Sequence, residues 1–412
     1  MDFDLIVIGA GAVGLAVAAE LASRGSVLVV EREDGIGRGI SSRNSEVVHA
    51  GIYYQPGSLK ARLCVEGRRL IEGWAAQGRF GYRRAGKFIV AVEENERPAL
   101  QALLEQGRAN GVAGLRWAEP GELEAAEPAV AACAALWSPD TGILDSHGLM
   151  RFLLDRAQAA GAQLALRSRV VALRSIDSGW ELSVVEDERA EAVSDEVSDT
   201  SSDTGSSDLS SAADTARGPR TVVSARRVVN AAGLHADQIA ALAGIDVAGE
   251  GLRQYWSRGE YFAPAAGRSI PFRHLIYPVP PAEGQGHLGI HVTVDLGGGV
   301  RFGPSAQWPD PVHSRREDYR QDGSLRGLFA ASLRRFLPGL EARDLEPAGV
   351  GLRPRLRPAR DFVIREESGR GLPGLLTLVG VESPGLTCAP AIAREVARLL
   401  AMGPADWAEG ML

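Results

Sequence analysis

Residues 4–31 constrain the fold of this 412-residue chain more strongly than any other stretch. An apolar run, Leu5–Ile8, gives way to a glycine-rich turn, and an alanine-rich stretch then leads to a second apolar run, Val27–Val30, which ends on Glu31. A strand, a tight turn, a helix and a second strand in this order form the βαβ unit that binds dinucleotides. The sequence therefore predicts an α/β (α+β) fold with a Rossmann-like nucleotide-binding domain that starts near residue 4.

Each glycine of the turn has a separate role. Gly9 permits the turn, Gly11 leaves room for a pyrophosphate against the backbone, and Gly14 allows the helix to pack closely on the strand. The helix begins with free N–H groups and the positive end of its dipole, which favour phosphate. The residues expected to contact the cofactor here are Gly9, Gly11, Ala12, Val13, Gly14, Glu31 and Arg32. A glycine-rich turn in an ordinary α/β domain is the alternative.

The acid at the end of the second strand indicates which dinucleotide is bound. Glu31 can accept hydrogen bonds from both ribose hydroxyls of an adenosine. This contact requires a free 2′-hydroxyl, so the motif favours FAD or NAD over NADP. We expect FAD, because flavoprotein oxidoreductases commonly carry this unit at the start of the chain.

The composition excludes several classes of protein. A formal net charge of −7 gives no reason to expect a nucleic acid as partner. Three widely spaced cysteines, Cys64, Cys133 and Cys388, predict neither a disulfide framework nor a C-x-x-C metal site, so we expect no metal and a reducing cytoplasm. No apolar run is long enough for a transmembrane span, and the first one lacks the basic flank of a signal peptide.

The rest of the chain alternates between helix-like and strand-like segments. Helices are expected from Leu59 and over residues 98–111, 145–160 and 314–337, with strands over 86–92, 168–175, 180–186 and 221–230. Residues 187–220 are rich in Ser, Asp and Thr and have almost no large apolar side chain, so they cannot offset the entropy of ordering. We expect a disordered insertion in a hairpin turn; an acidic partner-binding segment is the alternative.

Five further motifs carry a resemblance to a known family. They are SSRNSEVVHAGIYYQPGSLKARLCVEG from residue 41, RGEYF, HLIYPVP, LGIHVT, and VESPGLT before the last helix. With these motifs, the chain resembles the D-amino-acid-oxidase superfamily of FAD-dependent oxidoreductases, and within it the L-2-hydroxyglutarate dehydrogenases and oxidases. The resemblance implies a discontinuous FAD-binding domain (residues 1–85, 142–250 and 345–412). An antiparallel-sheet substrate domain (residues 86–141 and 251–344) would be interleaved with it.

The resemblance also places several loops and one strand against FAD. In this family the loop at residues 41–45 crosses the pyrophosphate and the flavin edge, although from the residues alone a capping loop is an alternative. The strand at Val171 meets the adenine, and the loop at residues 383–387 opens the last helix towards the flavin. The residues expected to contact FAD in these segments are Ser41, Ser42, Arg43, Asn44, Ser45, Val171, Ala231, Ala232, Gly233, Ser383, Gly385, Leu386 and Thr387.

Oxidation of a 2-hydroxy acid requires a cation that holds the substrate carboxylate. Arginine binds a carboxylate bidentately. Arg353 in the GLRP motif matches the carboxylate-binding arginine of related amine and amino-acid oxidases, and we expect it to contact FAD as well. Arg355, Arg357 and Arg258 are candidates for a second cation, with solvated surface arginines as the alternative.

The reaction also requires a base for the hydroxyl proton, and histidine has a pKa near working pH. His291 lies on a strand that roofs the flavin in this family, and His49 lies in a loop beside the isoalloxazine. We expect one of them to be the base and the other its hydrogen-bonding partner; two structural histidines are the alternative. Tyr277 is expected to offer its hydroxyl to the substrate.

The resemblance thus implies an enzyme that oxidises a small carboxylate substrate, L-2-hydroxyglutarate, to 2-oxoglutarate by hydride transfer to flavin N5. Oxidation of another 2-hydroxy acid or an amino acid is the first alternative, and a non-catalytic flavoprotein subunit is the second. The electron acceptor is left open between a quinone, dioxygen and a soluble carrier. A quinone would require a cytoplasmic protein that docks peripherally at the inner membrane.

Overall fold

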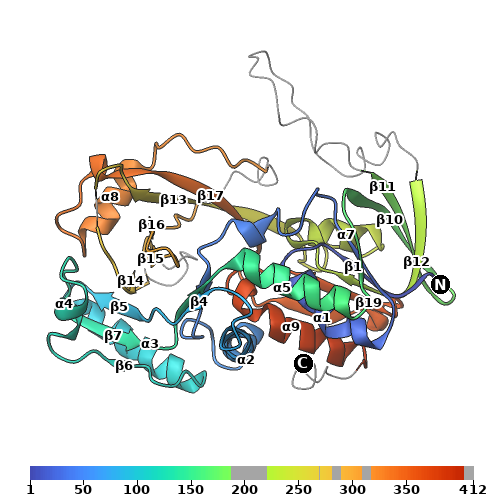
Figure 1. Ribbon diagram of the computed structural model, residues 1–412, viewed down its shortest axis with the longest axis horizontal. Coiled ribbons are helices and arrows are strands. Elements are labelled where there is room, and N and C mark those ends of the chain that lie inside the picture. Colours follow the sequence, from blue (N-terminus) through green and yellow to red (C-terminus); the bar gives the residue numbers. More distant parts are fainter. Residues whose placement is uncertain (187–219, 269, 281–288, 309–316, 403–412) are drawn as a thin grey trace, which may run out of the picture.

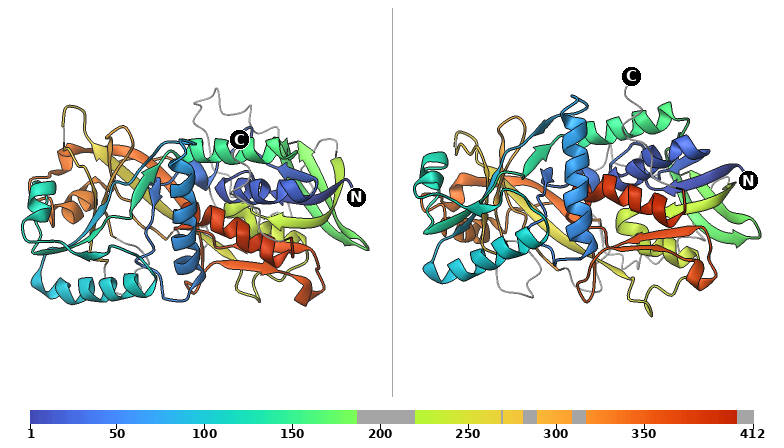
Figure 2. Two further views of the ribbon diagram at one scale, coloured as in Figure 1. Left: turned by 60° about the horizontal axis from the view of Figure 1, so that its bottom comes forward. Right: turned by 90° about the horizontal axis from the view of Figure 1, so that it is seen from below.

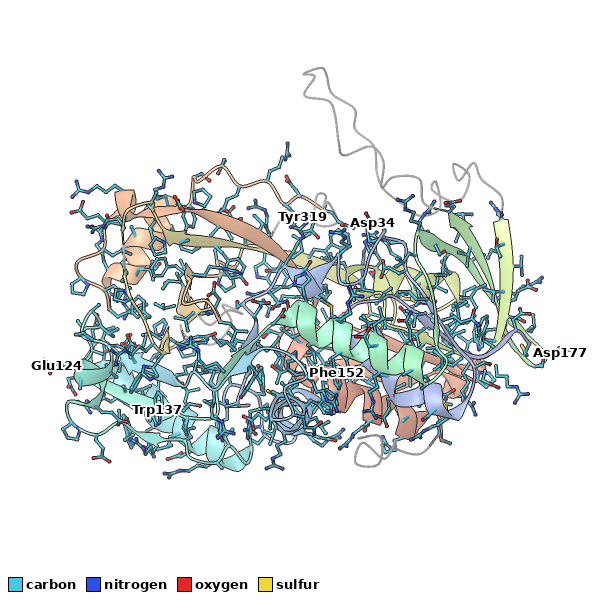
Figure 3. All side chains as sticks on the ribbon, in the orientation of Figure 1. Asp34, Glu124, Trp137, Phe152, Asp177 and Tyr319 are labelled. Carbon is cyan, nitrogen blue, oxygen red and sulfur yellow. The ribbon has the colours of Figure 1, made fainter. Side chains whose placement is uncertain are left out.

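The fold is known from a computed structural model that describes residues 1–186, 220–268, 270–280, 289–308 and 317–402. The molecule is elongated, with one large sheet towards each end (Figure 1). Figure 2 shows the helix α2 (Leu59–Ala75) standing between these two halves. Side chains fill the space between the ribbons (Figure 3).

The first sheet is built around the N-terminal strand and has eight strands in the described part of the chain. Its strands are β1 (Phe3–Ile8), β2 (Val27–Val30), β9 (Gln163–Ala165), β10 (Ser168–Ile176), β11 (Gly179–Glu186), β12 (Arg220–Asn230), β18 (Val363–Glu366) and β19 (Leu375–Val379). β1 pairs in parallel with β2 on one side and with β12 on the other, and β19 pairs in parallel with β12. Segments far apart in sequence therefore meet at the carboxyl end of β1.

Helices cover both faces of this sheet. They are α1 (Ala12–Leu21), α5 (Ser146–Ala159) and α9 (Gly385–Leu399), which share one apolar core, and α7 (Ala236–Leu242), which belongs to another. α1 packs against both α5 and α9 and is buried on nearly its whole surface. Its small and apolar side chains allow that close contact, which explains why its sequence has no polar stripe.

The second sheet also has eight strands among the described residues. They are β5 (Lys87–Ala91), β6 (Arg116–Trp117), β7 (Ala134–Ser138), β13 (Gln254–Pro264), β14 (Leu275–Pro278), β15 (Val292–Val294), β16 (Val300–Phe302) and β17 (Leu345–Leu356). The sheet follows the order β17-β13-β16-β15-β14-β5-β7-β6, and most of its pairs are antiparallel. Three helices belong to the same half of the molecule: α3 (Arg97–Ala109), α4 (Glu122–Ala126) and α8 (Arg326–Arg334).

Two smaller features join the halves. β3 (Val47–Val48), β4 (Tyr82–Arg83) and β8 (Gly142–Leu144) form a short antiparallel sheet. α2 packs against α9, and the Gly67 position allows this contact because a Cβ there would lie 2.1 Å from the Thr387 carbonyl oxygen. None of the described helices is long and apolar enough to cross a membrane.

The α/β fold class and most element positions predicted from the sequence are confirmed, but the helix expected over residues 314–337 is wrong in its extent. Residues 314–316 lie outside the described residues, and α8 begins only at Arg326. Gly323 has a φ of +77°, and the Asp322 carboxylate accepts a hydrogen bond of 2.8 Å from the Ser324 N–H. This local turn competes with helix formation.

The insertion expected at residues 187–220 lies outside the described residues except for Arg220, which begins β12. The strands on either side of it, β11 and β12, pair antiparallel, with Val185 opposite Arg220. The division of the chain into two domains remains a proposal. Because β17 pairs with β13 in the second sheet, we propose the last boundary after Leu356 rather than at residue 345.

Candidate active site

The turn after β1 is held by close backbone approaches. Gly9 has a φ of +106°, a conformation that favours glycine, and a Cβ there would lie 2.6 Å from the carbonyl oxygen of Ala231. A Cβ on Gly14 would lie 1.9 Å from the carbonyl oxygen of Gly9. Ala12 and Val13 open α1 directly after Gly11. A side chain at position 9 or 14 would therefore push the turn, the helix and the strand apart.

The acid expected at the ribose lies at this turn. Glu31 Oε2 accepts a hydrogen bond of 2.7 Å from the Ala10 N–H, and Oε1 accepts one of 3.0 Å from the Glu33 N–H. These bonds orient the carboxylate at the carboxyl end of β2. Each oxygen keeps a further lone pair for a ribose hydroxyl.

Arg32, in contrast, points towards protein partners. Its guanidinium lies 2.7 Å from Glu317 and 2.8 Å from His235 Nε2. Burial alone would raise the pKa of Glu317, but the hydrogen bond from His235 and the Arg32 charge lower it to about 2. Arg32 therefore ties the end of β2 to the segment around Glu317, and its contact with a cofactor remains a prediction.

The loop at residues 41–45 is folded onto the start of α1. Ser41 Oγ accepts a hydrogen bond of 3.0 Å from the Ala12 N–H, and Asn44 Nδ2 donates one of 2.7 Å to the Ser41 carbonyl. Ser42 Oγ donates to the Gly39 carbonyl at 3.3 Å. Ser41 thus occupies part of the N-terminus of α1, where the pyrophosphate is expected.

The end of this loop reaches the second half of the molecule. Ser45 Oγ lies 3.0 Å from the hydroxyl oxygen of Tyr261 on β13. The guanidinium of Arg43 lies 3.9 Å from the ring centroid of Tyr319, a residue labelled in Figure 3. Arg43 is exposed, so its contact with a cofactor also remains a prediction.

Two further segments surround the same turn. The ladder between β10 and β11 pairs Val170 with Val184 and Ala172 with Ser183, so Val171 sits in a bulge without a partner on β11. Ala231, directly after β12, donates its N–H to the Ile8 carbonyl at 3.0 Å; Ala232 and Gly233 follow it. The bulge and this return loop leave backbone groups beside the nucleotide turn.

The first turn of α9 and the loop before it contact the loop that carries His49. Thr387 Oγ1 accepts a hydrogen bond of 3.1 Å from the His49 N–H and donates one of 3.3 Å to the Val47 carbonyl. Ser383 Oγ lies 3.4 Å from His49 Nε2. Gly385 and Leu386 form the first turn of α9. His49 Nδ1 is buried and has no hydrogen-bond partner among the described residues.

Tyr277 lies on β14, and His291, which was expected on a strand, directly precedes the neighbouring strand β15. Their rings stack with centroids 3.8 Å apart. His291 is 5% exposed, and its Nδ1 lies 2.9 Å from the Gly289 carbonyl oxygen, a partner that requires the proton to be on Nδ1. Its Nε2 is therefore the nitrogen with a free lone pair.

Electrostatics join these residues to His49 and Arg353. Burial, followed by the charges of Lys87 and Arg353, lowers the pKa of His49 to about 3. Burial also lowers the pKa of His291 to about 3, with Arg353, His49 and Lys87 contributing and the Gly289 carbonyl opposing. Both imidazoles are thus neutral near pH 7 and can accept a proton, but each is a weaker base than a free histidine, whose pKa near working pH was the reason to expect it here. The structure brings His49, His291, Tyr277 and Arg353 into one cluster.

The other arginines considered as second cations have protein partners. Arg258 contacts Glu260 and the carbonyl of Arg320. Arg355 lies 3.4 Å from Glu382, and Arg357 lies over the ring of Trp308. These contacts place the three guanidinium groups in protein interactions.

Two residues of the cluster, Lys87 and Tyr53, were not predicted from the sequence. Lys87 Nζ lies 4.5 Å from the ring centroid of Tyr53 and 4.6 Å from that of Tyr277. The chain has only two lysines and Lys87 begins an otherwise apolar strand, but neither fact by itself indicates that the side chain is buried. Tyr53 carried no pattern of its own beyond the GIYY motif.

These features fit the FAD expected from the sequence. A glycine cradle, an oriented acid, a bulge at Val171 and a helix N-terminus converge on one side of the first sheet. The imidazole and arginine cluster lies where the loop of His49 meets the loop before α9. Such an arrangement can hold a dinucleotide and place an anionic small molecule beside neutral imidazoles.

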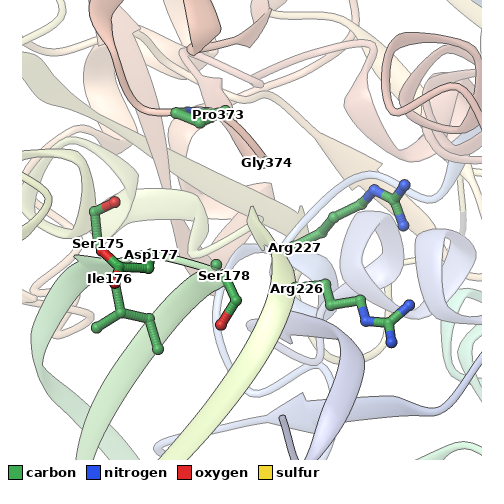
Figure 4. Close-up of a pocket in the computed structure, with 9 residues that line it drawn as sticks. Ser175, Ile176, Asp177, Ser178, Arg226, Arg227, Pro373 and Gly374 are labelled. Atoms are coloured by element: carbon green, nitrogen blue, oxygen red, sulfur yellow. The ribbon is translucent and has the colours of Figure 1, made fainter.

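A surface cavity of about 330 Å³ lies elsewhere, at the turn between β10 and β11. Ser178, Arg226, Arg227 and Pro373 are among the residues that line it (Figure 4). None of the residues expected at the active site lines this cavity.

Comparison with known proteins agrees with the geometry. The family model described as FAD dependent oxidoreductase matches residues 4–399. The chain is 38% identical to the mitochondrial L-2-hydroxyglutarate dehydrogenase of Arabidopsis thaliana, over 96% of this chain and 82% of that protein. It is 27% identical to the L-2-hydroxyglutarate dehydrogenase of Indibacter alkaliphilus, over 89% and 92% of the two chains.

A solved structure with the same fold is the L-α-glycerophosphate oxidase of Mycoplasma pneumoniae with FAD bound. It superposes with a TM-score of 0.77 over 98% of this chain and 96% of that one, at 24% identity. At this identity the likeness establishes the shared fold.

Proposed function

This chain belongs to the FAD-dependent oxidoreductase family, and we propose that it oxidises the 2-hydroxyl of L-2-hydroxyglutarate to give 2-oxoglutarate. The observation that carries the proposal is the convergence of two neutral imidazoles and Arg353 in one cluster. The 38% identity to a plant L-2-hydroxyglutarate dehydrogenase supports the choice of substrate.

FAD is the cofactor of this family, and when bound it supplies the acceptor for the hydride that leaves Cα. We propose that the glycine cradle of residues 9–14, Glu31, the loop at residues 41–45 and the backbone at Val171 hold its pyrophosphate and adenosine. We further propose that residues 231–233 and 383–387 border its remaining part.

We assign a separate task to each residue of the cluster. Arg353 binds and orients the substrate carboxylate through two parallel hydrogen bonds. His291 accepts the hydroxyl proton at Nε2, because its Nδ1 proton is held by the Gly289 carbonyl. The Tyr277 hydroxyl contacts the substrate, and His49 offers a further hydrogen bond through Nδ1, which has no partner among the described residues.

We propose a cytoplasmic enzyme, since the three cysteines are free thiols. The electron acceptor is a quinone, dioxygen or a soluble carrier; a quinone acceptor would require peripheral docking at the inner membrane. Steady-state assays with each acceptor distinguish the three.

Anaerobic reduction of the enzyme-bound flavin tests the substrate assignment. L-2-hydroxyglutarate is expected to bleach the flavin absorbance, whereas the D-enantiomer should leave it unchanged. An amino acid or a monocarboxylate that bleaches the flavin while L-2-hydroxyglutarate does not would contradict the proposal. Flavin that no small acid reduces would indicate a non-catalytic flavoprotein.

A further inference from the structure

The cluster contains a buried cation to which the proposed function gives no task. Lys87 begins β5, and its side chain is 1% exposed. In the part of the chain that the structure describes, its ammonium group has no hydrogen bond or ion pair, and it lies over the rings of Tyr53 and Tyr277. A buried charge is normally paired.

The surroundings of Lys87 supply no negative charge. Burial lowers the pKa of Lys87 to about 7, and among the described residues only Cys64 opposes this. No described carboxylate contributes to the lowered pKa of Lys87 or of His49. The cluster therefore carries two cations, Lys87 and Arg353, and lacks an anion to neutralise them.

Two residues that act on or contact Lys87 also carry polar atoms without partners. The Tyr53 hydroxyl is buried and has no hydrogen-bond partner among the described residues, and the same holds for His49 Nδ1. Leaving such groups unpaired is unfavourable unless a ligand satisfies them. Lys87, Tyr53 and His49 thus offer a charge and hydrogen-bonding groups to a molecule that enters the cluster.

We propose that Lys87 binds the second carboxylate of a dicarboxylic substrate, the one away from the oxidised carbon, and so determines specificity for dicarboxylates. The inference rests on the proposed function, which assigns the first carboxylate to Arg353. The flat faces of Tyr53 and Tyr277 hold the ammonium by cation–π attraction until the anion arrives. A monocarboxylate of the same length would leave the ammonium buried and unpaired.

Equilibrium binding to the FAD-loaded enzyme tests this assignment without turnover. Glutarate and pentanoate have the same chain length and differ in the second carboxylate, and neither has a hydroxyl to oxidise. The wild-type protein should bind glutarate about 30-fold or more tightly than pentanoate, as expected for a buried charge-assisted contact. Lys87→Met keeps the side-chain volume and removes the charge. It should reduce the ratio of the two affinities to about 3 or less, mainly by weakening the binding of glutarate.

Lys60→Met is the matched control, because Lys60 is the other lysine of the chain and pairs with Glu382. It should leave the glutarate-to-pentanoate ratio unchanged. Lys87→Arg, which keeps the charge, should retain part of the preference. FAD content and the melting temperature of each variant establish that it is folded.

Three results would overturn the assignment. The first is a wild-type protein that binds glutarate and pentanoate with equal affinity. The second is a Lys87→Met protein that still prefers glutarate, and the third is a Lys87→Met protein whose affinity falls equally for both acids. Failure of the proposed function is distinct, because it appears as an absence of flavin bleaching by L-2-hydroxyglutarate in the wild type. A preference for glutarate that depends on Lys87 would then still support a dicarboxylate site.

Discussion

The imidazole of His291 lies against the phenol ring of Tyr277, with 3.8 Å between the ring centroids and 21° between the planes. The Gly289 carbonyl holds the Nδ1 side of the same imidazole at 2.9 Å. One face and one edge of the ring are thus fixed by the protein, and Nε2 is left in a defined direction. A general base requires this fixed orientation.

Replacement of His291 should affect the chemical step more than substrate binding. His291→Gln should lower kcat by about 10²- to 10⁴-fold with a small change in KM, because the proton acceptor is lost while the cations remain. Stopped-flow reduction of the flavin measures the step directly. If His49→Gln gives this result and His291→Gln does not, the two histidines exchange roles.

Replacement of Arg353 should affect binding first. Arg353→Ala should raise the KM for L-2-hydroxyglutarate by roughly 30- to 150-fold, equivalent to about 2–3 kcal/mol for a lost charge-assisted contact. Arg353→Lys should recover only part of this, because an ammonium group cannot make the bidentate contact. A fall in kcat without a change in KM would contradict the role assigned to Arg353.

Cofactor retention should depend on Gly14. A Cβ at this position would lie 1.9 Å from the Gly9 carbonyl oxygen, so Gly14→Ala must displace either the turn or α1. We expect purified Gly14→Ala to contain much less FAD than the wild type, measured as the ratio of flavin to protein absorbance. Gly73→Ala is the control, since a Cβ there has no atom within 4 Å and the residue lies inside the helix α2. Equal flavin content in the two variants would contradict the proposal that the glycine turn at residues 9–14 holds FAD.

The buried His291 should make the fold sensitive to acid. Its pKa falls from 6.5 to about 3 on folding, so between these pH values the unfolded chain binds the proton and the folded protein does not. Stability is therefore lost as pH falls below about 6.5, and His291 should account for about 2 kcal/mol at pH 5. Urea unfolding at pH 7 and pH 5 should show a smaller difference for His291→Gln than for the wild type. The exposed His147 provides the control variant, His147→Gln, whose pH dependence should match the wild type.

The pKa of Lys87 predicts a second pH dependence, in which the affinity for a dicarboxylate falls as the pH rises. Its ammonium faces Tyr53, Tyr277 and Cys64, with the neutral His49 and His291 and the charged Arg353 nearby. Because its pKa lies near 7, Lys87 loses its proton above neutral pH, and the affinity for glutarate should fall between pH 7 and pH 9. The dissociation constant of pentanoate should change little over this range. An equal loss of affinity for glutarate and pentanoate would indicate that another group causes the pH dependence.

The sequence predicted the fold where local pattern and tertiary structure agree. The βαβ unit, the hairpin of β10 and β11 and the last helix follow from apolar periodicity and glycine positions, and the structure has them. The helix expected from residue 314 fails because the periodicity beyond Leu325 says nothing about the turn at Asp322 and Gly323. Apolar period alone does not fix where a helix begins.

The candidate site was predictable in part for a different reason. His49, His291 and Arg353 belong to motifs that resemble a family, so they could be named before their proximity was known. Lys87 could not be named, because its importance arises from the rings of Tyr53 and Tyr277, which come from other segments of the chain. A lysine at the start of a strand has no local mark of its burial.

The order of strands in the first sheet has a consequence for how the protein matures. β1 is synthesised first, but β12 and β19 beside it come from residues 220–230 and 375–379, and α9 covers α1 only after residue 399 has been made. A nascent chain still on the ribosome therefore exposes the glycine turn without the strands and helix that enclose it. Flavin loading is expected to follow release of this region from the exit tunnel, and translation intermediates that end before residue 375 should carry no flavin.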